Sequence, residues 1–181
     1  MYSFSRATRL TVRPNAPFHM VPALSNAEAD EILAGATTLT SLRQSADDRR
    51  ACIRFIREGN VFPYDSTGAS GPRPNVVFTE DDYDHLLENV RATVRVVSAI
   101  AYPQRAWGMA EVGVPGSIVV VRDMAGWAPP FIWAHELWHT AGLEGRTVDT
   151  PTAIINEGEE PRPTGNELNE YEAAAYYAAA P

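Results

Sequence analysis

Hydrophobic and polar positions recur with clear periods along the first part of the chain. The segment Arg9–Arg13 alternates apolar and polar residues, which predicts a strand that ends at the following proline. Over Ser25–Leu42, apolar residues recur three and four positions apart, which predicts a helix with Ser25 or Asn26 as its N-cap. The segment Ala51–Arg57 alternates again and predicts a second strand.

The middle of the chain repeats this change between strand and helix patterns. A short strand is predicted at Val76–Phe78, and Thr79 is expected to cap the helix that follows it. The β-branched run Val94–Ile100 predicts a strand, whereas the prolines and glycines of Tyr102–Gly116 predict a segment that is mostly loop. The segment Ser117–Val121 is apolar throughout, which is typical of a buried strand.

The last third begins with an apolar helix. Pro129 or Pro130 fits its first turn, where a missing N–H costs nothing, and Gly142 is expected to end it. Residues 145–165 are predicted to be irregular, and residues 166–177 predict a final helix. This order of elements predicts a single α/β domain over residues 1–181, built around one sheet.

Composition excludes several classes of protein. The chain has 181 residues, 45% of them hydrophobic, and carries a formal net charge of −8, which argues against nucleic-acid binding. Its apolar runs, such as Ile118–Val121, are far shorter than a bilayer span, so we expect no membrane association. Cys52 is the single cysteine, which excludes an intrachain disulfide and a cysteine-based metal cluster. Residues 1–6 lack the apolar core of a secretory signal, which predicts a cytoplasmic protein, or a secreted one if a leader was removed.

The predicted apolar helix carries the spacing His-Glu-x-x-His, from His135 to His139. Residues four apart lie on one face of a helix, so the two imidazoles can bind one metal ion. Zinc favours imidazole nitrogen, and Glu136 lies beside the first ligand, where it can act as a general base on a water molecule. A catalytic zinc site normally has three protein ligands, but His19 and His85 lie elsewhere and are expected to be structural.

The residues from His135 to Leu143 resemble the start of the metzincin motif HExxHxxGxxH/D, with Gly142 in register. The segments Ala29–Leu33, Cys52–Phe55 and Gly116–Arg122 are also similar to parts of small bacterial matrixin-like metzincins. The resemblance implies a zincin fold: a mixed, twisted sheet of about five strands, an active-site helix and a C-terminal helix. It also implies a zinc metallopeptidase that acts on a peptide or protein substrate.

Two positions depart from that family pattern. The third metal ligand of the family falls at Gly145, which has no side chain to offer. The methionine turn corresponds to Ala153–Asn156, where Ile155 replaces methionine and can fill the same space.

Three acidic residues are candidates for the third ligand. Asp149 lies in a loop slightly longer than that of the family, and a carboxylate oxygen can bind zinc. Glu144 comes one residue before the family position, and Glu157 resembles the third ligand of the gluzincins. Asp149 is the first choice, and a site with no third ligand is the remaining alternative.

The sequence thus predicts a Zn²⁺-dependent metalloendopeptidase with His135, His139 and Asp149 as ligands and Glu136 as general base. The alternative is a catalytically impaired protein of the same fold that binds a peptide or protein partner in the former cleft. The sequence specifies neither the cleavage specificity nor the oligomeric state.

Overall fold

The computed structural model describes residues 5–14, 24–40, 52–64, 75–122, 129–142 and 144, which form three helices and eight strands. The helices are α1 (Asn26–Thr40), α2 (Glu80–Asn89) and α3 (Pro129–Thr140). The strands are β1 (Ser5–Leu10), β2 (Val12–Pro14), β3 (Cys52–Arg57), β4 (Val76–Val77), β5 (Val94–Val97), β6 (Ala99–Ile100), β7 (Gly108–Met109) and β8 (Ile118–Val121).

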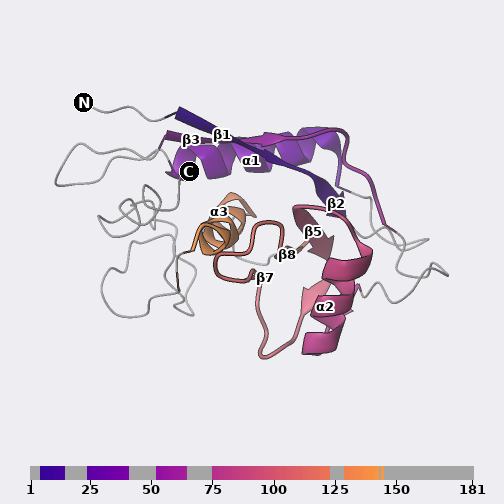
Figure 1. Ribbon diagram of the computed structural model, residues 1–181. Helices are drawn as coiled ribbons and strands as arrows, with labels where there is room; N and C mark the ends of the chain where they lie inside the picture. Colours follow the sequence, from indigo (N-terminus) through magenta and orange to yellow (C-terminus); the bar gives the residue numbers. More distant parts are fainter. Residues whose placement is uncertain are drawn as a thin grey trace.

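Thr11 alone separates β1 from β2, and these two strands connect the pair β1–β3 to the sheet that contains β2, β5, β8 and β7 (Figure 1). β1 pairs with β3, and β2 pairs with β5, which pairs in turn with β8; all three pairings are parallel. β7 pairs antiparallel with β8 and lies at the edge of its sheet. With β1 and β2 taken as one interrupted strand, the order is β3, β1/β2, β5, β8, β7.

The helices cover opposite faces of this sheet. α1 packs against β3 and α3, and α3 packs against β8 and β7 (Figure 1). On β5, Arg95 points away from the face that carries Val94 and Val96, because side chains alternate along a strand. The Arg95 guanidinium reaches the backbone of α2, so α2 lies on the face opposite to α3.

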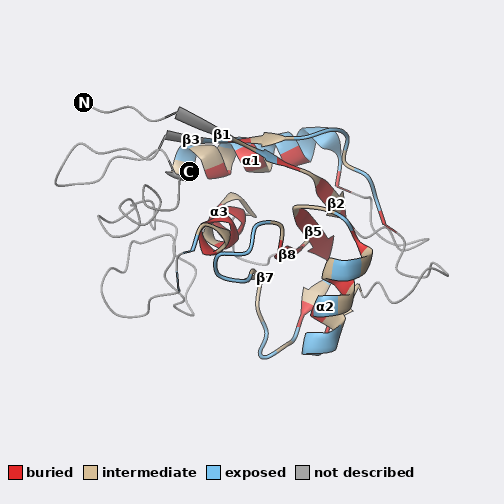
Figure 2. Ribbon diagram, in the orientation of Figure 1, coloured by how far each residue is buried: buried red, intermediate tan, exposed pale blue. Residues whose placement is uncertain are grey.

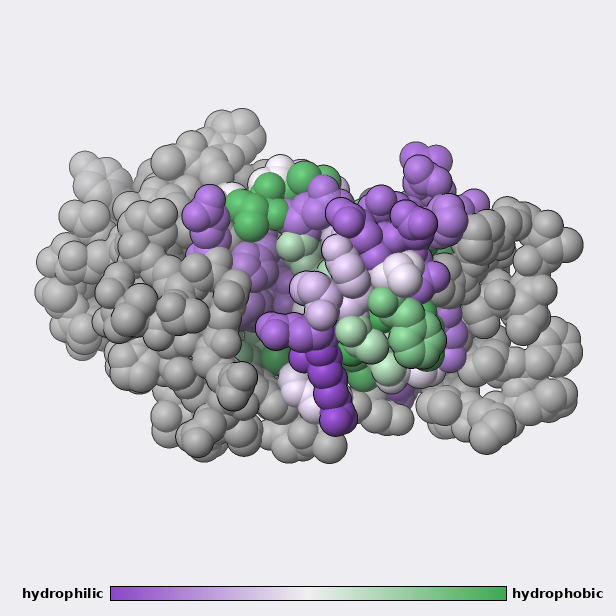
Figure 3. All heavy atoms as spheres, turned by 90° about the horizontal axis from the view of Figure 1, so that it is seen from below, coloured by the Kyte–Doolittle hydropathy of each residue, from purple (hydrophilic) through white to green (hydrophobic). Residues whose placement is uncertain are grey.

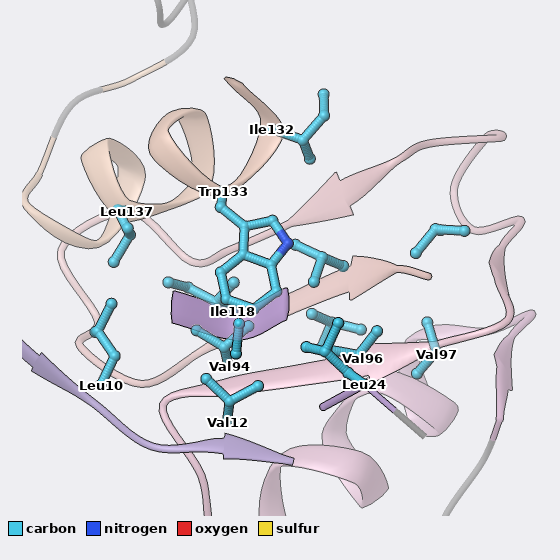
Figure 4. Packing of buried hydrophobic residues seen from close by; sticks show 14 of the residues in the cluster. Leu10, Val12, Leu24, Val94, Val96, Val97, Ile118, Ile132, Trp133 and Leu137 are labelled. Atoms are coloured by element: carbon cyan, nitrogen blue, oxygen red, sulfur yellow. The ribbon is translucent and has the colours of Figure 1, made fainter. Parts of the chain in front are cut away.

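The core lies between α3 and the parallel strands. Trp133 projects from α3 toward Val94 and Ile118, with Val12 and Leu24 nearby, and only 2% of it is exposed (Figure 4). α3 is buried along most of its length, whereas α2 is buried along one face (Figure 2). An almost fully buried helix explains why the Pro129–Thr140 segment is apolar nearly all round.

Local signals predicted the helices well. α1 and α3 lie where the apolar periodicity placed them, and Thr79 caps α2 through a capping box with Asp82. The predicted α/β class with a mixed sheet is confirmed.

One strand prediction was wrong in detail, and one short strand was not predicted. The run Val94–Ile100 is broken at Ser98, whose N–H bonds to Asn75, and its end becomes β6, which pairs with β4. The predicted loop Tyr102–Gly116 contains β7, a strand of two residues that its pairing with β8 defines. Such short pairings have no periodic pattern of their own.

Several predictions lie outside the described residues: the final helix, the irregular segment before it, the methionine-turn equivalent, His19, Asp149 and Glu157. No helix in the described part of the chain is long and apolar enough to cross a membrane. On the face shown in Figure 3, exposed hydrophobic residues form small patches that hydrophilic residues separate.

Candidate metal and catalytic site

α3 carries the site, and its packing fixes the two histidines and the glutamate in place. The helix begins at Pro129 and Pro130, and its middle is anchored in the core by Trp133 and Ala134. Glu136 is 4% exposed, so its carboxyl group lies almost entirely out of contact with solvent. The helix therefore keeps a buried carboxyl group at one defined position.

His135 and His139 lie one turn apart and their rings converge. Their Nε2 atoms are 3.0 Å apart, and the rings meet edge to face with centroids separated by 4.7 Å. Two nitrogen ligands of a tetrahedral zinc ion lie about 3.3 Å apart, because each bond is about 2.0–2.1 Å long. The separation of the two Nε2 atoms, which is also a hydrogen-bonding distance between the rings, is close to that of two ligands of one zinc ion. His139 is 8% exposed, whereas His135 is only partly buried, so one of the two imidazoles is shielded from bulk water.

The described residues provide two of the expected ligands. Within residues 5–14, 24–40, 52–64, 75–122, 129–142 and 144, no group of three His, Cys, Asp or Glu residues could hold a metal ion. Glu144 belongs to this described part, is exposed, and does not complete such a group. Asp149 and Glu157 lie outside it.

Glu136 packs directly against β7, the edge strand. A Cβ atom placed on Gly108 would lie 2.3 Å from Glu136 Oε1 and 2.7 Å from its Cγ. The Glu136 side chain thus occupies the space that a side chain at position 108 would need. Gly108 was not identified from the sequence, since the Gly-Met pair lies in a segment predicted to be loop.

The C-terminal end of α3 is tied to the loop between β7 and β8. The His139 carbonyl oxygen accepts hydrogen bonds from the N–H of Gly142 at 2.8 Å and of Gly113 at 2.9 Å. Gly142 has φ +96°, a backbone conformation that favours glycine and lets the chain turn away from the helix, as the sequence predicted. These bonds satisfy a helix-end carbonyl beside the proposed metal ligands.

Tyr83 and Arg95 form a buried polar cluster on the face of the sheet opposite to α3. Burial raises the pKa of Tyr83, and the charges of Glu111 and Glu136 raise it further, so its hydroxyl stays protonated and donates to the Ser117 carbonyl at 2.6 Å. Burial also lowers the pKa of Arg95 to about 10, which leaves the guanidinium charged at neutral pH.

Comparison with known proteins adds information at the level of the fold. The chain matches no protein-family model, and no curated protein is similar to it in sequence. Its fold is similar to that of a metalloproteinase. The solved structure of metalloproteinase-II from Bacteroides fragilis aligns with a TM-score of 0.56 at 11% identity, over 99% of this chain and 54% of that one. This chain therefore spans about half the length of that protein.

A second similar structure is a chaperone–substrate complex, with a TM-score of 0.48 at 11% identity, over 97% of this chain and 34% of that one. The alignment with metalloproteinase-II, at 11% identity, shows a similarity of fold alone. The predicted α/β architecture, with a mixed sheet and a helix that carries the His-Glu-x-x-His segment, is similar to a metalloproteinase fold.

Proposed function

We propose that this chain is a zinc-dependent peptide hydrolase of the metzincin type. The observation that carries the proposal is the 3.0 Å separation of the His135 and His139 Nε2 atoms on one buried helix, with Glu136 between them in sequence. The similarity to a metalloproteinase fold supports the same conclusion.

His135 and His139 would hold the metal ion through Nε2, and Asp149 is proposed as the third ligand. A bound zinc ion would supply a Lewis acid, which polarises the peptide carbonyl and acidifies a water molecule. Glu136 is proposed to accept the proton of the attacking water and then to donate it to the amine that leaves. Glu136 is 4% exposed and packs against Gly108 of β7, which gives its carboxyl group a defined position.

Metal content, measured by elemental analysis on protein purified without chelators, tests the ligand set. The wild-type chain is expected to hold about one zinc ion, and His139→Ala to lose it. His85→Ala is the matched control, because His85 lies on α2 and should leave the zinc content unchanged. Loss of zinc in Asp149→Ala but not in Glu144→Ala would identify Asp149 as the third ligand.

Hydrolysis of labelled casein tests the catalytic assignment. Glu136→Gln is expected to keep its zinc and to lose at least a hundredfold in rate, since general-base catalysis contributes about 10²–10⁴-fold. A chain that holds zinc weakly, and binds casein peptides without cleaving them, would instead be the peptide-binding alternative.

A further inference from the structure

The contact between β7 and α3 involves the whole Glu136 side chain. A Cβ atom at position 108 would lie 2.3 Å from Oε1, 2.7 Å from Cγ and 2.8 Å from Cδ of Glu136, distances that real Cβ atoms do not show. Rotation of the carboxyl group about its last bond would move Oε1 but would leave Cγ in place. An alanine at position 108 therefore requires Glu136 to change its side-chain conformation.

Neighbouring contacts oppose a shift of either backbone that would relieve such a clash. On the strand side, Gly108 pairs with Val120 of β8, and the Trp107 carbonyl accepts a bond from the Val121 N–H at 2.9 Å. On the helix side, Leu137 and Trp138 are buried next to Glu136. Well-packed interiors relax only partly, so we expect the Glu136 side chain, rather than either backbone, to move.

We propose that Gly108 is a positioning residue. Because Gly108 has no side chain, the Glu136 carboxyl group can take the position from which it acts as general base at the metal site of His135 and His139. This inference rests on the proposed function, because it gives Gly108 a role in hydrolysis through Glu136. Gly108 acts through Glu136, by leaving space for its side chain.

The variant Gly108→Ala tests the role in catalysis. Zinc content and KM for labelled casein are expected to stay within about twofold of wild type, because the two imidazoles keep their places. The value of kcat is expected to fall at least tenfold, since small displacements of a catalytic group cost up to about a hundredfold. An unchanged kcat would overturn the proposal.

Gly35→Ala is the matched control for general damage to packing. Its added Cβ would lie 2.7 Å from the Pro130 side chain, at a contact between α1 and α3 that does not involve Glu136. We expect this variant to lose stability while kcat stays near the wild-type value. A parallel loss of kcat in both variants would mean that the effect at Gly108 is merely structural.

A double-mutant cycle in urea denaturation tests the contact without any need for activity. Gly108→Ala is expected to lower the urea midpoint by about 0.5 M or more in the wild-type background. In the Glu136→Ala background the clashing atoms are absent, so the same substitution should cost less than half of that. Equal losses in both backgrounds would refute the proposed contact.

The two proposals fail in different ways. A wild-type chain without zinc and without cleavage of casein would refute the proposed hydrolase, and the coupling between positions 108 and 136 would still be measurable. A zinc-loaded, active chain whose kcat is insensitive to Gly108→Ala would refute the positioning role alone.

Discussion

Arg95 is buried in the middle of β5, and its replacement by methionine tests what holds the C-terminal end of α2 in place. The guanidinium donates four hydrogen bonds to backbone carbonyl oxygens: from Nε to Leu86 and Val90, and from the terminal nitrogens to Leu87 and Gly116, at 2.5–3.2 Å. One arginine therefore satisfies the last carbonyls of a helix and anchors the turn before β8.

The loss of stability expected for Arg95→Met follows from these hydrogen bonds. All four carbonyls lose a charged donor, but Leu86 keeps its hydrogen bond from the Val90 N–H at 3.0 Å, so the main cost arises at the other three. A hydrogen bond to a charged group contributes about 1.5–3 kcal/mol, and the desolvation of the guanidinium offsets part of the sum. We expect Arg95→Met to lower the free energy of unfolding by about 3 kcal/mol.

Urea denaturation followed by circular dichroism measures this loss, which corresponds to a fall in midpoint of about 1–2 M. Arg91→Met is the control: Arg91 is exposed just after α2, and its replacement should change the free energy of unfolding by less than about 0.5 kcal/mol. A loss below about 1 kcal/mol in Arg95→Met would refute the view that this arginine caps the helix.

Three further predictions concern the core, the helix end and the response to pH. Trp133→Ala removes a core side chain that is 2% exposed, and should lower the melting temperature by about 10 °C or more. Gly142→Ala forces a side chain onto a residue with φ +96°, so urea denaturation should show a loss of about 1–2 kcal/mol; no loss would contradict the assigned conformation. Hydrogen bonds from Ser25, and then Arg122, lower the pKa of Glu28 from 4.5 to about 2, so its contribution is present above pH 4.5 and lost as the pH falls toward 2. Because Glu28 is partly exposed, the stability difference between wild type and Glu28→Gln should stay below about 1 kcal/mol at pH 6 and vanish near pH 2.

Local patterns in the sequence were sufficient to predict α3 and the placement of its two histidines on one face. The spacing of His135 and His139 places both imidazoles on one face of any helix, independently of tertiary contacts. In the structure their Nε2 atoms lie 3.0 Å apart. The start of α2 was equally predictable, because the Thr79 capping box lies within four consecutive residues. The apolar run Ile118–Val121 is likewise a buried central strand, as its composition predicted.

Tertiary structure decided which distant residues contact the helices. Arg95 lies in an apolar run, and nothing in the sequence pattern distinguished it from other strand residues. In the structure its side chain reaches the end of α2, on the face of the sheet opposite to α3. Gly108 lies in a segment that its glycines and prolines predicted to be loop, yet pairing with β8 places it against Glu136. The physical reason is the same in both cases: helix periodicity and caps arise from neighbours in sequence, whereas strand pairing and close packing depend on segments that only folding brings together.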